Sequence, residues 1–162
     1  MTDATAPASP RPTVALVHGA FADSSGWNDV VGQLQAAGIA VQAISNPLRG
    51  ITADAAYVAS AIRQIPGPVL AVGHSYGGAI ITNAAPHAGN VVGLVYVAAF
   101  APDEGETLSD IEGDSKDSVL NTALLQLQYP AGQGTQTAAE FAIDPARFHI
   151  FRSACTGSGT PY

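Results

Sequence analysis

The strongest chemical signal in the chain is a serine with a glycine two residues away on either side, Gly73-His74-Ser75-Tyr76-Gly77. The apolar run 69–72 precedes this segment, and a stretch suited to a helix, 78–81, follows it. A serine at a sharp strand-to-helix turn takes a strained backbone conformation, and the glycines let the two elements approach each other. The pattern therefore predicts that Ser75 is a nucleophile, presented at the positive end of a helix dipole.

A second chemical element follows the first apolar run of the chain, at His18-Gly19-Ala20-Phe21. A loop whose backbone N–H groups face a serine nucleophile binds the oxygen of a tetrahedral intermediate. We expect the amides of Ala20 and Tyr76 to form such an oxyanion hole. Phe21 and Trp27 are candidates for the wall of a substrate pocket, although aromatic residues at a helix start are also typical of a core.

The elements that must position these residues are visible as four apolar runs, at residues 14–17, 39–44, 69–72 and 91–97. Continuous rather than alternating hydrophobicity indicates strands covered on both faces, as in a parallel sheet. Helical spacing predicts helices over 25–37, 52–64 and 79–88, with Asp23 or Ser24 capping the first and Thr52 the second. The alternation predicts an α/β fold with a doubly wound, mainly parallel sheet and helices on both faces.

The domain organisation expected from composition is simple. Residues 1–12 are rich in Ala, Thr and Pro and predict a disordered leader. Residues 13–149 predict one domain, in which 101–137 is a loop or lid-like insertion with a helix over 116–128. Residues 150–162 have no helical or strand period and predict an irregular tail.

Composition narrows the classes of partner. The chain has 162 residues, a net charge of −7 and only six Lys and Arg, which argues against nucleic acid and anionic membranes and favours a small-molecule substrate. The single cysteine, Cys155, excludes an intramolecular disulfide, and we expect neither a metal nor a cofactor. The N-terminal segment has no signal-peptide pattern and the apolar run 91–101 is too short to span a bilayer, so a cytoplasmic location is expected.

Three segments make the chain resemble the α/β-hydrolase superfamily: residues 16–21 together with Trp27, residues 73–78, and residues 95–102. The resemblance covers about residues 13–149 and is to small esterase-like members, a group that includes plant methyl-ester esterases and hydroxynitrile lyases. It implies a partial fold in which the four strands are the third to sixth of the family, in the order 4-3-5-6. It also implies a serine hydrolase that cleaves a small-molecule carboxylic ester through a Ser75 acyl-enzyme.

The resemblance implies that an acid and a histidine base follow the nucleophile in the chain, in the order Ser, Asp or Glu, His. Asp103 follows the run 91–97, where some relatives carry their acid, but a solvated turn carboxylate is the better interpretation. His149 is a weak candidate for the base, while His18 and His74 are expected to shape the loops. No seventh or eighth strand is predicted, so we expect the triad acid and base to be missing from this chain.

That expectation leaves other functions open. The chain fits a catalytically impaired fragment of such an enzyme, or a lyase or haloperoxidase on the same fold, because function resides in the site and not in the fold. A sheet that stops at the fourth apolar run also exposes an apolar edge strand. Such an edge predicts a homo-oligomer formed through it.

Overall fold

The structure is a computed structural model that describes residues 10–103, 106–113, 120–132 and 134–149. The chain divides into two compact units, Met1–Asp103 and Glu104–Tyr162, which are described here one after the other. Most of the expected leader and the expected tail, with Cys155, lie outside the described residues.

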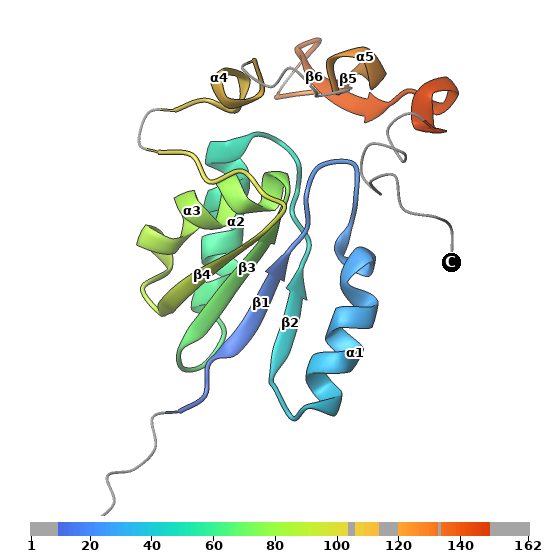
Figure 1. Cartoon of the computed structure of the whole chain (residues 1–162). Helices are drawn as coiled ribbons and strands as arrows, with labels where there is room; N and C mark the ends of the chain where they lie inside the picture. Colours follow the sequence, from blue (N-terminus) through green and yellow to red (C-terminus); the bar gives the residue numbers. More distant parts are fainter. Residues whose placement is uncertain (1–9, 104–105, 114–119, 133, 150–162) are drawn as a thin grey trace, which may run out of the picture. The chain divides into compact units, whose positions relative to one another are not determined.

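The first unit is built on a four-stranded parallel sheet (Figure 1). Its strands are β1 (Thr13–Val17), β2 (Val41–Ile44), β3 (Val69–His74) and β4 (Val91–Val97), in the spatial order β2-β1-β3-β4. All three neighbouring pairs are parallel. The predicted fold class is confirmed, and this order is the predicted 4-3-5-6 when β1 is counted as the third strand.

Helices cover both faces of this sheet, with α1 (Asn28–Ala36) on one face and α2 (Ile51–Arg63) and α3 (Tyr76–Ala88) on the other (Figure 1). The first predicted helix begins as a 3-10 turn, η1 (Ser24–Trp27), capped by Asp23, whose Oδ1 accepts from Ser25 N–H at 2.7 Å. The prediction of Thr52 as a cap is wrong. Helix α2 begins one residue earlier, after Gly50, whose φ of 113° only glycine adopts without strain.

Each face of the sheet has its own hydrophobic core, which explains why the strands are apolar at successive positions. Along β1, Ala15 and Val17 face α2 and α3, whereas Val14 and Leu16 face the α1 side. The larger core includes the fully buried Val58, Ile62, Val69, Ile80 and Ile81. Burying each aliphatic side chain of this size stabilises the fold by about 1.5–3 kcal/mol, which anchors the strand ends that carry the site.

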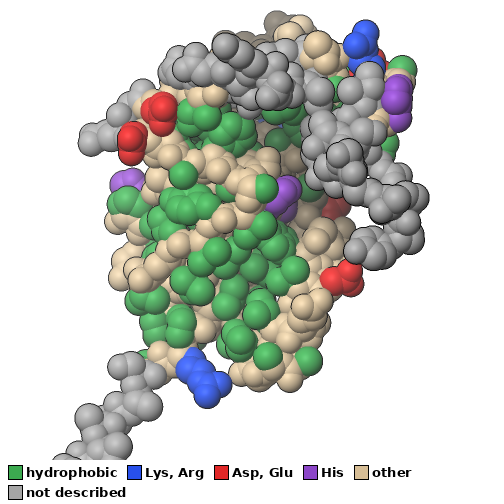
Figure 2. Space-filling model, viewed as in Figure 1, with side chains coloured by type: hydrophobic (Ala, Val, Ile, Leu, Met, Phe, Trp, Pro, Cys, Tyr) green, Lys and Arg blue, Asp and Glu red, His purple; other side chains and the backbone are tan. Residues whose placement is uncertain are grey.

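Strand β4 is the outer strand of the sheet and pairs only with β3 among the described strands. It carries no charged residue, and Val92 is 64% exposed. Val95, Tyr96 and Val97 are each about 40% exposed as well. Figure 2 shows hydrophobic side chains gathered over this region of the first unit. The apolar edge expected from the sequence is therefore present.

The second unit holds an antiparallel strand pair, β5 (Leu124–Pro130) and β6 (Thr137–Ile143), in a sheet of its own. Three short helices accompany it: α4 (Leu108–Gly113), α5 (Leu120–Ala123) and η2 (Pro145–Arg147). The predicted helix over 116–128 is wrong, because residues 124–128 belong to β5 and only 120–123 are helical among those described. No helix in the described part of the chain is long and apolar enough to cross a membrane.

Candidate active site

Ser75 lies at the carboxyl end of β3, in the turn that leads into α3, with φ 52° and ψ −124°. A non-glycine residue takes such a conformation only where its surroundings enforce it. Backbone hydrogen bonds do so here. Ser75 N–H donates to Val97 O at 3.3 Å, and the Ser75 carbonyl accepts from Gly78 N–H at 3.0 Å and Phe100 N–H at 3.1 Å. The serine is thus held at a sharp elbow between strand and helix.

The glycines around the elbow are required by close backbone contacts. A Cβ atom on Gly73 would overlap the carbonyl of Gly77, and one on Gly77 would overlap the carbonyl of Val17. A Cβ on Gly78 would overlap the carbonyl of Phe100. The strand, the helix and the neighbouring loops can approach this closely only without side chains, which is the physical reason for the glycine spacing seen in the sequence.

The loop after β1 passes directly over Ser75. A Cβ atom on Gly19 would lie 2.8 Å from Ser75 Cβ and 3.3 Å from Ser75 Oγ. Ala20 is the next residue of that loop, and Tyr76 is the first residue of α3, where backbone N–H groups have no acceptor within the helix. This proximity supports the prediction that the Ala20 and Tyr76 amides form an oxyanion hole.

His18 is buried beneath this loop and both of its ring nitrogens are engaged. Its Nε2 accepts from Asn46 N–H at 2.8 Å, so Nδ1 carries the proton and donates to Gly19 O at 2.8 Å. His18 is therefore not available as a base for Ser75. Because the Gly19 carbonyl and the Ala20 N–H belong to one planar peptide, His18 sets the direction of that N–H.

The other histidines of the first unit are placed away from the serine hydroxyl. The exposed His74 ring lies edge-on to Trp27, with 6.3 Å between ring centroids. His87 lies twelve residues beyond Ser75, about 18 Å along the axis of α3, and its carbonyl accepts from the Arg63 guanidinium. Within residues 10–103 no histidine is hydrogen-bonded to Ser75.

The two predicted pocket residues lie in different environments. Phe21 is 40% exposed, in the loop that follows Ala20, and has a φ of 62°. Trp27 is buried among Val14, Leu16 and Val72, which favours the core interpretation of this residue. Contact of either ring with a substrate stays a prediction.

The weak candidates for the acid and base stay predictions as well. Asp103 is exposed at the end of the first unit, six residues beyond β4. His149 is exposed in the second unit, just after η2. Asp144 caps η2, because its Oδ1 accepts from Ala146 N–H at 2.9 Å.

One residue of the site was missed by the sequence reasoning. Asp54 in the first turn of α2 is fully buried, and its Oδ2 accepts from the Tyr76 hydroxyl at 2.9 Å. A signal for it exists in the sequence, because Asp54 shares the buried stripe of α2 with Val58 and Ile62 at four-residue spacing. A carboxylate on an apolar stripe requires a partner, and that partner is Tyr76, the residue after Ser75.

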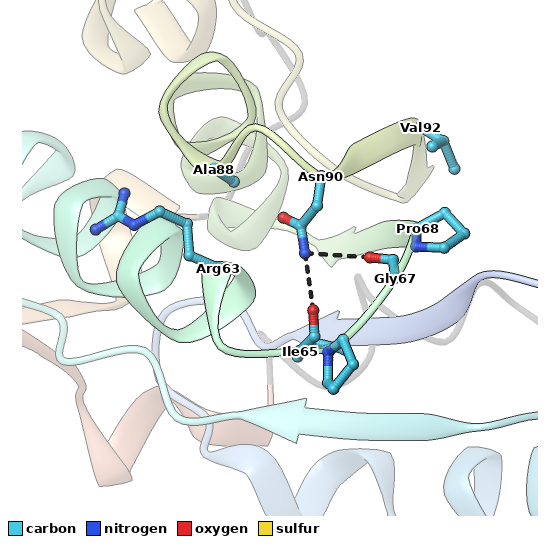
Figure 3. A pocket seen from close by; sticks show the side chains of 8 residues that line it. Arg63, Ile65, Gly67, Pro68, Ala88, Asn90 and Val92 are labelled. Atoms are coloured by element: carbon cyan, nitrogen blue, oxygen red, sulfur yellow. Dashed lines mark hydrogen bonds between the residues drawn. The ribbon is translucent and has the colours of Figure 1, made fainter.

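The described residues contain no group of three side chains suited to hold a metal. A shallow hollow lies near the amino ends of β3 and β4 (Figure 3), about 20 Å along β3 from Ser75. Asn90 spans its floor, where Nδ2 donates to Ile65 O at 3.0 Å and Gly67 O at 3.3 Å. The hollow holds no nucleophile and is far from the elbow, so we assign it no part in the site. It is lined by Arg63, Ile65, Pro66, Gly67, Pro68, Ala88, Asn90 and Val92.

Solved structures with the same fold include polyneuridine aldehyde esterase, with a TM-score of 0.67 and 18% identity, where the match covers 86% of this chain and 61% of that one. A pyrethroid hydrolase matches with a TM-score of 0.64 and 23% identity, over 93% and 64% of the two chains. Tomato methylketone synthase I matches with a TM-score of 0.65 and 17% identity, over 87% and 60%.

The chain thus spans about three fifths of the length of these structures. No curated protein sequence matches it. The profile described as "Alpha/beta hydrolase family" matches residues 14–155, which is most of the chain and includes both the elbow and the loop above it. The chain therefore belongs to the alpha/beta hydrolase family.

Proposed function

We propose that this chain carries the nucleophile and the oxyanion hole of a serine hydrolase that acts on a small-molecule carboxylic ester. The observation that carries the proposal is the strained Ser75, held with its side chain directly beneath the loop of Gly19 and Ala20. Two of the solved structures with this fold are named as an esterase and a hydrolase, which supports the same class of reaction.

In the proposed reaction the Ser75 hydroxyl attacks the ester carbonyl carbon, and the carbonyl oxygen becomes an oxyanion facing the Ala20 and Tyr76 amides. The bond to the alcohol oxygen then breaks, and the alcohol leaves with the proton that the serine gave up. Water attacks the resulting acyl-enzyme, which releases the carboxylic acid and restores the serine hydroxyl. Preorganised amides stabilise the charge without moving during the reaction, which is why the backbone must be rigid here.

The proton acceptor for Ser75 comes from outside residues 10–103 in this proposal, because His18 is fully engaged, His74 packs edge-on against Trp27 and His87 is distant. His149 is the candidate within the chain. The magnitude at stake is large: loss of the histidine of a triad costs about a millionfold in turnover, while the oxyanion hole and binding alone retain about a thousandfold over water.

The test is covalent labelling by a fluorophosphonate, followed by turnover of p-nitrophenyl butyrate. We expect stoichiometric labelling of Ser75, complete loss of labelling in Ser75→Ala, and unchanged labelling in the control Ser45→Ala. Ser45 is exposed and its hydroxyl is bonded to Ser24. Folded protein that is not labelled at all would refute the proposal.

Turnover separates the alternatives that the sequence leaves open. Labelling with ester hydrolysis only about a thousandfold above water indicates the catalytically impaired form. Faster hydrolysis that depends on Ser75 indicates a complete proton relay. Cleavage of a cyanohydrin with no acyl-enzyme trapped by acid quenching indicates a lyase on the same fold, and halogenation of a phenol by bromide and peroxide indicates a haloperoxidase.

A further inference from the structure

The carboxylate of Asp54 is the one fully buried acidic side chain among the described residues. Removing a carboxylate from water is costly unless hydrogen bonds replace the lost solvation. Asp54 receives two such bonds: Oδ1 accepts from Arg49 N–H at 2.8 Å, and Oδ2 accepts from the Tyr76 hydroxyl at 2.9 Å. Its place in the first turn of α2 adds a favourable interaction with the helix dipole.

The Tyr76 hydroxyl acts as a proton donor in this pair. Burial, followed by the hydrogen bond and the negative charge of Asp54, raises the pKa of the Tyr76 phenol above its ordinary value. The phenol therefore stays protonated over the whole pH range in which an esterase works. A hydrogen bond to a charged acceptor is shorter and stronger than one between neutral groups, so the ring is firmly tethered.

The tether, the hydrogen bond between Tyr76 and Asp54, holds the residue next to Ser75. Tyr76 follows Ser75 directly and supplies the amide that we assign to the oxyanion hole. Strain at Ser75 persists only where contacts on several sides maintain it. The β4 side is held by Val97 and Phe100. The side toward α2 is held through the Tyr76 side chain.

Asp54 also reaches the loop after β2, through its bond to the amide of Arg49. The same loop begins near Asn46. The backbone N–H of Asn46 donates to His18 and fixes its ring, and the ring in turn fixes the Gly19-Ala20 peptide. One short loop is therefore bonded to the segments that carry both oxyanion donors.

We propose that Asp54 is a positioning residue of the active site, which fixes the Tyr76 amide and the Ser75 elbow through its hydrogen bond to the Tyr76 hydroxyl. The expected effect on the reactivity of Ser75 rests on the proposed function, whereas the expected effect on the rigidity of the elbow rests on the structure alone. Asp54 acts through Tyr76 and touches no reacting atom.

The test removes only the hydroxyl, with Tyr76→Phe, and uses Tyr57→Phe as the matched control. Tyr57 lies on α2 and is 53% exposed, so its hydroxyl can be lost without a buried partner. We expect Tyr76→Phe to slow fluorophosphonate labelling of Ser75 by about ten- to a hundredfold per folded molecule, because a shift of 1 Å costs about a hundredfold. We also expect a lower kcat with nearly unchanged KM, and no change in Tyr57→Phe.

Asp54→Asn is a second variant, and the double variant measures the energetic coupling between Asp54 and Tyr76. If both residues act through one bond, Asp54→Asn together with Tyr76→Phe slows labelling no further than the more severe single change. Additive effects of the two changes would overturn the proposal. So would a Tyr76→Phe protein that folds, loses stability and still labels at the wild-type rate.

Amide hydrogen exchange of the peptide 73–80 keeps the proposal testable if the serine is inert. Faster exchange of this peptide in Tyr76→Phe than in Tyr57→Phe supports the tether even when the wild type takes up no label, in which case only the hydrolase proposal fails. Unchanged exchange in an unlabelled protein overturns the tether as well. The two failures are thus distinguishable.

Discussion

The replacement of Gly19 by alanine tests the geometry of the site most directly. The added methyl group would lie 2.8 Å from Ser75 Cβ, about 0.7 Å inside an ordinary carbon–carbon contact of about 3.5 Å. The φ of Gly19 lies outside the left-handed region, so alanine fits the backbone, and the cost comes from this contact and from those with His74 O at 3.0 Å and Ser75 Oγ at 3.3 Å. The loop must therefore move away from Ser75 by about 0.7 Å.

A retreat of this size should remove most of the benefit of the Ala20 amide. Loss of one oxyanion donor costs about a hundred- to a thousandfold in turnover, and a displacement of 1 Å costs about a hundredfold. We expect Gly19→Ala to slow labelling of Ser75 by roughly thirty- to a hundredfold. Overpacking should also lower the free energy of unfolding by about 1–3 kcal/mol.

The matched control is Gly32→Ala, which makes the same chemical change in the middle of α1. A Cβ there meets nothing within 4 Å, and alanine in a helix is favoured over glycine by up to about 1 kcal/mol. The assay is the second-order rate constant of fluorophosphonate labelling, corrected for the folded fraction from thermal unfolding. A folded Gly19→Ala protein that labels as fast as Gly32→Ala would refute the placement of the loop above the serine.

Three further outcomes are expected. The pKa of Tyr76 is raised from 10.0, so the stability that its hydroxyl contributes is complete below pH 10 and is lost as the pH rises above that value. In urea unfolding, the free energy of unfolding should therefore fall more steeply with alkaline pH in the wild type than in Tyr76→Phe. The hydrogen bonds from Ser25 lower the pKa of Asp23 from 3.8, so Asp23→Ala should lower Tm at neutral pH but not well below pH 3.8. We expect two copies to pair through β4 and light scattering to show a concentration-dependent dimer, which Val95→Lys should abolish and Tyr57→Lys should not.

The sheet could be predicted from the sequence because its physical cause is local. Runs such as 69–72 are short, rich in β-branched residues and apolar at every position, as a strand buried on both faces requires. The elbow could be predicted because its glycines stand at fixed spacing around Ser75, although a Cβ on Gly77 or Gly78 would meet the backbone of Val17 or Phe100, far away in the sequence. Both signals are therefore present in short stretches of the sequence.

The strand pair of the second unit could not be predicted in the same way. Leu120, Leu124 and Leu127 stand at helical spacing, while residues 125–129 alternate between apolar and polar as a strand does. The two periods compete over one short segment, and the outcome depends on pairing with residues 137–143, which are rich in alanine. The segment 137–143 has so little strand propensity of its own that it cannot be predicted as a strand before its pairing with β5 is known.

Asp54 was missed for a different reason, and the reason bears on the whole site. The chemistry of Ser75 needs a rigid backbone, and rigidity here comes from buried polar contacts that no active-site motif contains: Asp54 with Tyr76, and Asn46 with His18. All of these contacts lie within residues 10–103. The contacts that hold the Ser75 elbow rigid are therefore a property of the first unit alone, whereas the proposed proton transfer requires a group outside it. Amide exchange of the peptide 73–80, which depends on the first, and labelling and turnover, which depend on both, should respond to different sets of mutations.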